Sequence, residues 1–358
     1  MTRAVHQLVP SFAPRDAIGN HALQVQDVLR GLGLASEIYV ADARPEVAHL
    51  SRPYRDLGDD ADTWLLYQSS TGSPMAEWLL GRPEPKLVNY HNITPASAFA
   101  PWEPHVGVEL QAGRRQLADL APVTELAVAD STYNERELIA LGYRKTTVVP
   151  ILLDTSTFDH AVDEAALEQL RADAAGGATW LFVGRIAPNK AQHDLVKAFA
   201  VYRRVYDERA RLRLVGGASS HRYLTALHDY VEALGLVEAV DIAGDVPDGV
   251  LGAHYRAADV YVSASDHEGF GVPLVEAMYH GVPVVAYGST AVPETLGDGG
   301  LCLADKSPTG VAAAVHRVCS DAAVRAALVA AGHRRVAQFD LAVNRRRFAD
   351  AVASVVSP

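Results

Sequence analysis

The chain has 358 residues, 49% of them hydrophobic and 21% charged, and a formal net charge of −11. This composition is typical of a globular protein large enough for two domains, and the acidic balance argues against a nucleic-acid partner. Its two cysteines lack metal-ligand spacing, which fits a reducing cytoplasm. No apolar run approaches the roughly 20 residues of a membrane span, and the run at the start is too short for a signal peptide. We therefore expect a cytoplasmic protein without a transmembrane segment.

Apolar strand-like runs alternate with helical patterns from end to end, which predicts an α/β fold of parallel sheets covered by helices. The expected strands of a first domain are residues 4–9, 37–40, 63–68, 86–90, 126–129 and 146–149. Those of a second domain are residues 179–183, 212–215, 240–243, 259–262 and 282–286. A turn-rich linker at 150–163 separates the two series. We assign residues 1–155 to the first domain and 156–339 to the second.

The loop at residues 11–21 follows the first expected strand. Gly19 would allow close approach of the backbone to phosphates or an acceptor, and Asn20 would cap the helix that follows. Asp16 would bind an acceptor hydroxyl or organise the loop. Further along the chain, Thr132 and Glu135 predict a capping box at the start of another helix.

Polar residues also follow two later strands of the first domain. Gln68, Ser69 and Gly72 come at the end of one strand, and His91 and Asn92 come at the end of the next. Ligands of open α/β sheets bind at the carboxyl ends of strands, so Gln68, Ser69, Gly72 and Asn92 are candidates for binding an acceptor. A lone histidine at a strand end is more often structural.

The second domain begins with the run FVGRIAPNK, which places Arg185 and Lys190 just after its first strand. These cations would neutralise a pyrophosphate and stabilise the negative charge that develops on it as a leaving group. Gly184 would permit the turn. The alternative is a pair of solvated loop residues.

The stretch at residues 261–287 is predicted to form a strand, a loop, a helix and another strand. Gly269 and Gly271 lie in the loop, and Pro273 is suited to the start of the helix. The glycines let backbone N–H groups approach a ligand closely, and the helix start adds a partial positive charge. This arrangement predicts a phosphate-binding loop.

Two carboxylates, Glu268 and Glu276, flank this loop. Ionised carboxylates accept hydrogen bonds and repel phosphate. They therefore suit hydroxyl groups that lie on either side of a phosphate. Phosphates between two sets of hydroxyls describe a nucleotide sugar. The alternative is a solvated Glu268 and a Glu276 that interacts with the helix dipole.

The run EGFGVPLVEAMYHGVPVV, with Glu268 and Glu276, resembles the two-glutamate signature of retaining glycosyltransferases of family 4. The resemblance implies a GT-B fold, in which two Rossmann-like domains face each other across a cleft. It also implies that a last helix, within residues 340–358, crosses back to the first domain. The expected activity is transfer of a hexose from a UDP- or GDP-linked donor to a hydroxyl of a sugar, lipid-linked or natural-product acceptor. A lipid-linked acceptor would bring the protein to the membrane surface.

The resemblance further implies roles for single residues. Glu276 would hold the ribose hydroxyls, and Glu268 would sit by the donor sugar. Amides near Gly269, Phe270 and Gly271 would meet the sugar or the pyrophosphate. His91 matches a histidine near the donor sugar, which would act through its ring or its backbone carbonyl. We thus predict catalytic roles for His91, Glu268, Arg185 and Lys190, donor contacts from Gly19, Gly184, Gly269, Phe270, Gly271 and Glu276, and acceptor contacts from Asp16, Asn20, Gln68, Ser69 and Asn92.

Two other functions fit the same residues less well. An epimerase-like enzyme of this fold would need acid and base groups aimed at the sugar ring. A catalytically silent partner that only binds nucleotide sugar would not need all of the charged residues Glu268, Glu276, Arg185 and Lys190. We expect no cofactor beyond the donor co-substrate. We also expect no metal, because the Asp-x-Asp of Asp60 and Asp62 precedes its strand and so lies at the edge of the sheet away from ligands.

Overall fold

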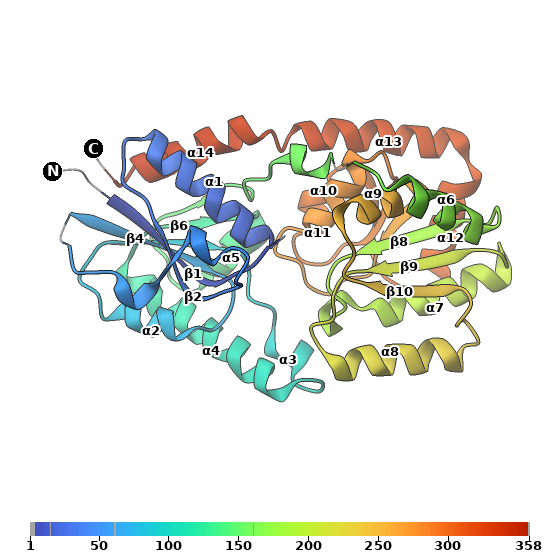
Figure 1. Cartoon of the computed structure of the whole chain (residues 1–358), viewed down its shortest axis with the longest axis horizontal. Helices are drawn as coiled ribbons and strands as arrows, with labels where there is room; N and C mark the ends of the chain where they lie inside the picture. The colour runs from blue at the N-terminus through green and yellow to red at the C-terminus, as the bar shows by residue number, and fades with distance from the viewer. Residues whose placement is uncertain (1–3, 15, 61, 160, 357–358) are drawn as a thin grey trace. The chain divides into compact units, whose positions relative to one another are not determined.

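The computed structural model describes residues 4–14, 16–60, 62–159 and 161–356. The chain folds into two compact units (Figure 1). Unit 1 comprises Met1–Ala100, Pro104–Leu153 and Phe339–Pro358, and unit 2 comprises Pro101–Glu103 and Asp154–Gln338. The short segment Pro101–Glu103 was assigned to the first domain from the sequence, yet it packs with unit 2. The indole of Trp102 meets the ring of Tyr223 edge-on, with 5.1 Å between centroids.

Unit 1 is built on a parallel sheet with the strand order β3-β2-β1-β4-β5-β6-β7. Its strands are β1 (Ala4–Phe12), β2 (Ile38–Ala43), β3 (Arg52–Pro53), β4 (Thr63–Ser69), β5 (Lys86–Tyr90), β6 (Thr124–Ala129) and β7 (Thr146–Val148). Its helices are α1 (Ala17–Gly31), α2 (Pro74–Leu80), α3 (Ala96–Phe99), α4 (Pro104–Leu120), α5 (Thr132–Ala140) and α14 (Leu341–Ala353), with short 3-10 turns at Ala48–Leu50, Tyr54–Asp56 and Ala121–Val123.

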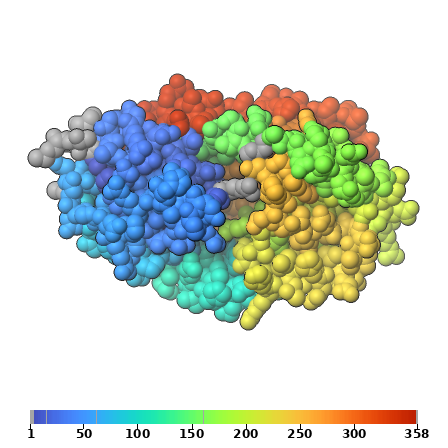
Figure 2. Space-filling view, viewed as in Figure 1, coloured from blue at the N-terminus to red at the C-terminus, as the bar shows by residue number. Residues whose placement is uncertain are grey.

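The last helix of the chain completes the core of unit 1. Phe348 and Val352 of α14 are buried in the same apolar cluster as Val5 of β1 and Leu29 of α1. On the surface of the unit, α14 lies beside α1 (Figure 2). The Arg345 guanidinium donates to the Gln24 side chain of α1 at 3.0 Å. Burial of this apolar face stabilises the helix against unit 1.

Unit 2 is built on a second parallel sheet, with the order β10-β9-β8-β11-β12-β13. Its strands are β8 (Thr179–Val183), β9 (Arg211–Val215), β10 (Val240–Gly244), β11 (Val260–Ser263), β12 (Val284–Tyr287) and β13 (Gly300–Leu303). Its helices are α6 (Glu164–Ala174), α7 (Gln192–Val205), α8 (His221–Ala233), α9 (Asp248–Ala257), α10 (Val272–Tyr279), α11 (Val292–Leu296), α12 (Pro308–Ser320) and α13 (Ala322–Ala337), with 3-10 turns η4 (Thr155–Phe158) and η5 (Pro188–Lys190).

The core of unit 2 is organised around Trp180 of β8, which is fully buried. Its indole packs edge-on against the rings of Phe199 and Tyr202 of α7, at centroid distances of 5.5 and 5.1 Å. Such edge-to-face pairs add stability beyond the burial of area. The two sheets with covering helices confirm the predicted class, an α/β protein with two Rossmann-like domains.

The structure corrects several local predictions. Ser131, not Thr132, caps α5, because its hydroxyl accepts from the N–H of Asn134. Asp16, not Asn20, caps α1, because the residue before the first helical one has the extended backbone that turns its side chain onto the free N–H groups. The sequence analysis also missed two strands. β3 is short and exposed, and β13 is a four-residue strand, GLCL, in which no residue is fully buried.

Within the described ranges, no helix is both long enough and apolar enough to cross a membrane.

Candidate active site

The candidate donor site lies at the carboxyl edge of the unit 2 sheet. β8 and β11 are parallel neighbours, with Trp180 opposite Val260. The loops that follow them therefore start at the same edge of the sheet and lie close together. One loop carries Arg185 and Lys190, and the other carries Glu268.

The two loops are joined by hydrogen bonds and one ion pair. The Asp266 N–H donates to the Asn189 carbonyl at 2.8 Å, and the Asn189 side-chain amide donates to the His267 carbonyl at 3.3 Å. Next to these bonds, Lys190 Nζ lies 2.6 Å from Glu268 Oε2. Both side chains are largely shielded from solvent, at 18% and 13% exposed, which strengthens the attraction relative to a surface pair. Lys190, which is predicted to bind phosphate, and Glu268, which is predicted to bind the sugar, are thus held together.

No side chain caps the N-terminus of α10. Gly271, the N-cap residue, has a φ of +93°. The left-handed backbone turns the chain sharply into the helix and suits glycine. Phe270 is buried, and its carbonyl accepts from the Thr295 hydroxyl at 2.6 Å. The N–H groups of the first turn therefore have no competing side-chain oxygen there, and the helix dipole favours an anion.

Glu276 lies further along α10 and is 8% exposed. Burial raises the pKa of its carboxyl to about 7, although a hydrogen bond from Tyr255 acts in the opposite direction. The Tyr255 hydroxyl donates to Glu276 Oε2 at 3.0 Å, and the Tyr255 ring stacks on His280 with 4.8 Å between centroids. The carboxyl is therefore fixed in place and poised to titrate near neutral pH.

Arg185 is exposed, and its backbone carbonyl accepts from the Gln192 side chain at 2.9 Å. The turn before it depends on a close approach of two chain segments. Gly216, at the end of β9, has a φ of +136°, and a Cβ there would overlap the Gly184 carbonyl. The Gly184 N–H donates to the Val215 carbonyl at 2.9 Å. The predicted turn at Gly184 thus needs a second glycine that the sequence analysis did not single out.

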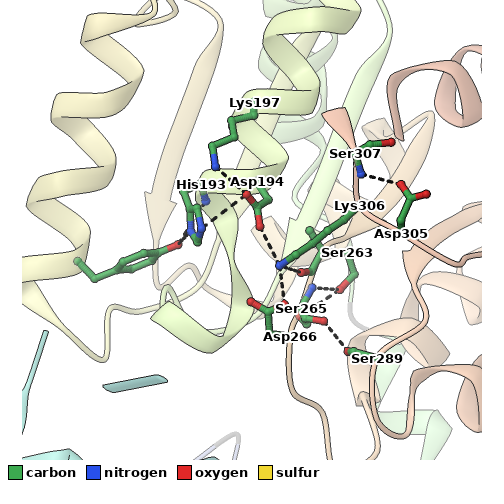
Figure 3. A network of polar contacts seen from close by, with 12 residues as sticks. His193, Asp194, Lys197, Ser263, Ser265, Asp266, Ser289, Asp305, Lys306 and Ser307 are labelled. Atoms are coloured by element: carbon green, nitrogen blue, oxygen red, sulfur yellow. Dashed lines mark hydrogen bonds and ion pairs between the residues drawn. The ribbon is translucent and has the colours of Figure 1, made fainter. Parts of the chain in front are cut away.

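A lysine from the loop after β13 braces the loop after β11 (Figure 3). Lys306 Nζ lies 2.8 Å from an Asp194 oxygen and 2.5 Å from an Asp266 oxygen. Burial alone would lower the pKa of Lys306, but the hydrogen bonds to these carboxylates outweigh burial and raise it. Ser289 donates to the Ser265 carbonyl in the same network. These contacts hold the backbone just before Glu268.

In unit 1, the His91 ring is enclosed by a chain of side-chain hydrogen bonds. Gln7 Nε2 donates to the Ala22 carbonyl at 2.8 Å, so Gln7 Oε1 is left to accept from Gln68 Nε2 at 2.7 Å. Gln68 Oε1 therefore faces His91 Nε2, also at 2.7 Å, and this nitrogen must carry a hydrogen. On the other side, Nδ1 lies 2.7 Å from Asp130 Oδ2. Both ring nitrogens are engaged inside the unit.

A second histidine continues this chain. The Leu152 N–H donates to His21 Nδ1 at 2.9 Å, so the proton of the neutral ring is on Nε2 and is donated to Asn89 Oδ1 at 2.9 Å. Burial, followed by repulsion from His91, lowers the pKa of His21 to about 4. The ring is therefore neutral at physiological pH and ties the start of the linker to the sheet.

Asn92 differs from its neighbours. Its φ is +76°, and its side-chain N–H donates to the Asn134 amide oxygen at 2.8 Å. Its own Oδ1 is buried and has no hydrogen-bond partner among the described residues. Asparagine tolerates a positive φ, whereas a buried oxygen without a partner indicates a position where a bound ligand could supply one.

The remaining predicted acceptor residues are engaged within unit 1. Gln68 and Ser69 are buried, and the Ser69 carbonyl accepts from the His91 N–H at 2.9 Å. Gly72 packs closely against the backbone of α4. These contacts give no support to direct binding of an acceptor by Gln68 or Ser69, which stays a prediction.

The residues predicted in the first loop have mainly local contacts. The Asp16 carboxylate accepts from the Gly19 N–H at 3.0 Å, which matches the loop-organising alternative for Asp16. Gly19 is buried beside the Phe12 ring, and Asn20 is exposed in the first turn of α1. In the part of the chain that the structure describes, no three His, Cys, Asp or Glu side chains are grouped as metal ligands.

The sequence analysis missed three partners of the site residues. Thr290 contacts the backbone of Glu268, Tyr255 contacts Glu276, and Gln7 orients Gln68. Gln7 offered a signal, because it is a polar residue next to the apolar run Leu8–Val9 of the strand and is itself fully buried. Thr290 and Tyr255 lie more than twenty positions from their partners, and no local motif marks them.

The fold is that of the GT-B glycosyltransferases. A sucrose-phosphate synthase from Thermosynechococcus elongatus has a TM-score of 0.76 at 18% identity, over 98% of this chain and 99% of that chain. The structure of Anabaena HepE in complex with UDP and glucose has a TM-score of 0.73 at 18% identity, over 98% of this chain and all of the other. Residues 171–335 match the family described as glycosyl transferases group 1. The matched segment lies within unit 2.

Curated relatives with glycosyltransferase names match parts of the chain. A D-inositol 3-phosphate glycosyltransferase from Kineococcus radiotolerans is 36% identical over 245 residues, which are 63% of this chain and 56% of the relative. A GDP-mannose-dependent alpha-(1-6)-phosphatidylinositol monomannoside mannosyltransferase from Mycobacterium tuberculosis is 34% identical over 199 residues, which are 52% of this chain and 50% of the relative. The chain thus spans about half the length of these relatives.

Proposed function

We propose that the protein is a retaining glycosyltransferase that transfers a hexose from a nucleoside diphosphate hexose to an acceptor hydroxyl. The observation that carries the proposal is the Lys190–Glu268 ion pair, at 2.6 Å, on the edge of the sheet that holds the uncapped start of α10. A cation, a set of N–H groups and two carboxylates then serve one ligand that has both phosphates and hydroxyls. The resemblance to family 4 belongs to this proposal.

In unit 2, each group has a role that its chemistry suits. Arg185, Lys190 and the first N–H groups of α10 bind the pyrophosphate. The ionised Glu276 accepts hydrogen bonds from the ribose hydroxyls, and Glu268 accepts from a hydroxyl of the hexose. Because Lys190 contacts Glu268, a phosphate bound to Lys190 helps to hold Glu268 in place, and a sugar bound to Glu268 helps to hold Lys190.

The chemical step breaks the bond between the anomeric carbon and the β-phosphate oxygen and forms one to the acceptor oxygen on the same face. The acceptor proton moves to the departing phosphate, so no strong protein base is needed. Arg185 and Lys190 stabilise the charge that develops on the leaving group. The same-face path accounts for retention without a protein nucleophile.

In unit 1, we assign acceptor and sugar contacts to the end of β5. Both His91 ring nitrogens are engaged by Gln68 and Asp130, so His91 acts through its backbone carbonyl. The unpaired Asn92 Oδ1 accepts from an acceptor hydroxyl, which would satisfy a buried oxygen. The relatives named above support a hydroxyl of an inositol or of a mannosylated lipid as the acceptor.

The test of donor binding is thermal stabilisation by UDP, GDP, UDP-glucose and GDP-mannose. A ligand at 100 times its Kd adds roughly 2.7 kcal/mol to the free energy of unfolding, which raises Tm by several degrees. We expect one base to stabilise the wild-type protein, and we expect the effect to shrink in Glu276→Ala. The exposed Glu232→Ala on α8 is the matched control and should behave as wild type.

The transfer itself is tested by incubating the selected donor with inositol phosphates and with phosphatidylinositol mannoside vesicles. A glycosylated product whose anomeric configuration matches that of the donor, by NMR, supports the proposal. Conversion of the donor to another sugar nucleotide without acceptor would indicate the epimerase instead. Failure of every nucleotide to bind would overturn the proposal.

A further inference from the structure

One hydroxyl contacts both polar groups of the Glu268 backbone, and the Ala291 N–H also donates to the Glu268 carbonyl, at a longer 3.4 Å. The Glu268 N–H donates to Thr290 Oγ1 at 2.8 Å, and the Thr290 hydroxyl donates to the Glu268 carbonyl, also at 2.8 Å. A hydroxyl has one hydrogen to donate and lone pairs to accept with, so this pair of bonds uses its hydrogen fully. Thr290 lies in the turn between β12 and α11, away from Glu268 in the chain.

Thr290 has an unusual backbone conformation for its residue type. Its φ is +47°, in the left-handed region, where a β-branched side chain is a steric outlier. Glycine or asparagine would adopt this conformation at lower cost. Strained residues of this kind persist where the surroundings over-determine them, and they gather at functional sites. The hydroxyl clasp on Glu268 gives a reason for threonine here.

The rest of the loop before Glu268 is already fixed by other contacts. Lys306 binds the Asp266 carboxylate, and Ser289 donates to the Ser265 carbonyl (Figure 3). The neighbouring His267 carbonyl accepts from Asn189. Thr290 completes this series at Glu268 itself, and beyond it the carboxylate reaches Lys190. The orientation of the carboxylate therefore depends on the backbone anchor at one end and on the lysine at the other.

We propose that Thr290 is a positioning residue for Glu268, and that its hydroxyl sets the preference of the site for a nucleoside diphosphate hexose over the bare nucleoside diphosphate. This inference rests on the proposed function, in which Glu268 contacts the hexose and Glu276 the ribose. Loss of the clasp lets the Glu268 backbone shift, so the contact with the sugar weakens. The nucleotide contacts of α10 are unaffected.

The test compares Thr290→Ser, Thr290→Val and Thr290→Gly with wild type. The readout is the ratio of two dissociation constants, for UDP against UDP-glucose or GDP against GDP-mannose, measured by calorimetry. Serine keeps the hydroxyl and should keep the ratio. Valine and glycine each lose both hydrogen bonds, so the preference for the sugar-bearing donor should fall roughly five- to tenfold, with a smaller change in the Kd of the bare diphosphate, which Glu268 affects only through Lys190. The exposed Thr225→Val on α8 is the control.

Thr290→Gly separates positioning from structure. Glycine relieves the backbone strain but also loses the two hydrogen bonds, so we expect the variant to fold with a Tm close to that of wild type and still to lose the sugar preference. If Thr290 served only the fold, the ratio of the two dissociation constants would change only in variants that lose thermal stability. The glycine variant would then keep the wild-type ratio. That result would overturn the inference even if the valine variant does not fold. If the wild-type protein binds neither the diphosphate nor the sugar nucleotide, the proposed function fails first and this inference fails with it.

Discussion

Replacing Glu276 by glutamine should stabilise the empty protein at alkaline pH and have little effect at acid pH. The carboxyl has a folded-state pKa of about 7 against 4.5 for the free group, because burial penalises its charged form. A raised carboxyl pKa means that the folded state binds a proton which the unfolded state has lost. Glu276 therefore makes its full contribution to the free energy of unfolding below pH 4.5, and this contribution is lost as the pH rises to about 7. Glutamine keeps the shape and can accept from Tyr255, but it does not ionise.

The expected size of the effect follows from the pKa difference. A shift of about 2.5 pH units at about 1.36 kcal/mol each gives about 3 kcal/mol in favour of Glu276→Gln above pH 7. The assay is urea unfolding followed by tryptophan fluorescence at several values between pH 5 and pH 8, to which the buried Trp180 of unit 2 contributes. Glu232→Gln, exposed on α8, controls for a generic loss of charge.

The pH dependence decides whether this reasoning holds. A constant difference between Glu276→Gln and wild type from pH 5 to pH 8 would refute it, as would a glutamine variant less stable than wild type at pH 8. Saturating nucleoside diphosphate hexose should shrink the difference, because ribose hydroxyls donate to the ionised carboxylate. A group kept at some cost in stability is what a binding role predicts.

Two further predictions concern other parts of the chain. His21→Gln should reduce the loss of unfolding free energy of unit 1 at acid pH, because His21, with its pKa lowered to about 4, removes stability as the pH falls below 6.5. The predicted gain in the free energy of unfolding is up to about 3 kcal/mol near pH 4. If the variant lost stability with falling pH as wild type does, another group would control the acid dependence. Gly216→Ala should destabilise unit 2 by about 1–3 kcal/mol, since its Cβ would overlap the Gly184 carbonyl, whereas Gly235→Ala, at a φ of +67° with open space around it, should cost only about 1 kcal/mol. Equal Tm values for the two glycine variants would contradict the overlap.

The fold could be predicted where apolar runs are long and bounded by turn residues. β5 and β8 begin and end where the sequence analysis placed them, at Lys86–Tyr90 and Thr179–Val183. β3 escaped because its residues are exposed and paired only at the edge of the sheet. Its conformation is set by the neighbouring strand, which a local pattern does not contain.

The candidate site could be predicted only where the chemistry is local in sequence. The motif around Glu268 and the loop with Lys190 were each visible, but their contact depends on β8 and β11 being neighbours. Thr290 was invisible for the same reason, and its φ of +47° has no signature in the residue type. His91 was predicted as a site residue, but the engagement of its ring by Gln68 and Asp130 required strands from three places in the chain.

The placement of α14 in unit 1 has a consequence for biosynthesis. A ribosome makes Val5 and Leu29 long before Phe348, yet these side chains share one apolar cluster. Unit 1 therefore has an unfinished core while all of unit 2 is being translated, whereas unit 2 from Asp154 to Gln338 is nearly continuous in sequence and can fold as it emerges. Nascent chains halted before residue 341 should expose the apolar face of α1, and the amino-terminal half of the protein should be the part that needs chaperone protection longest.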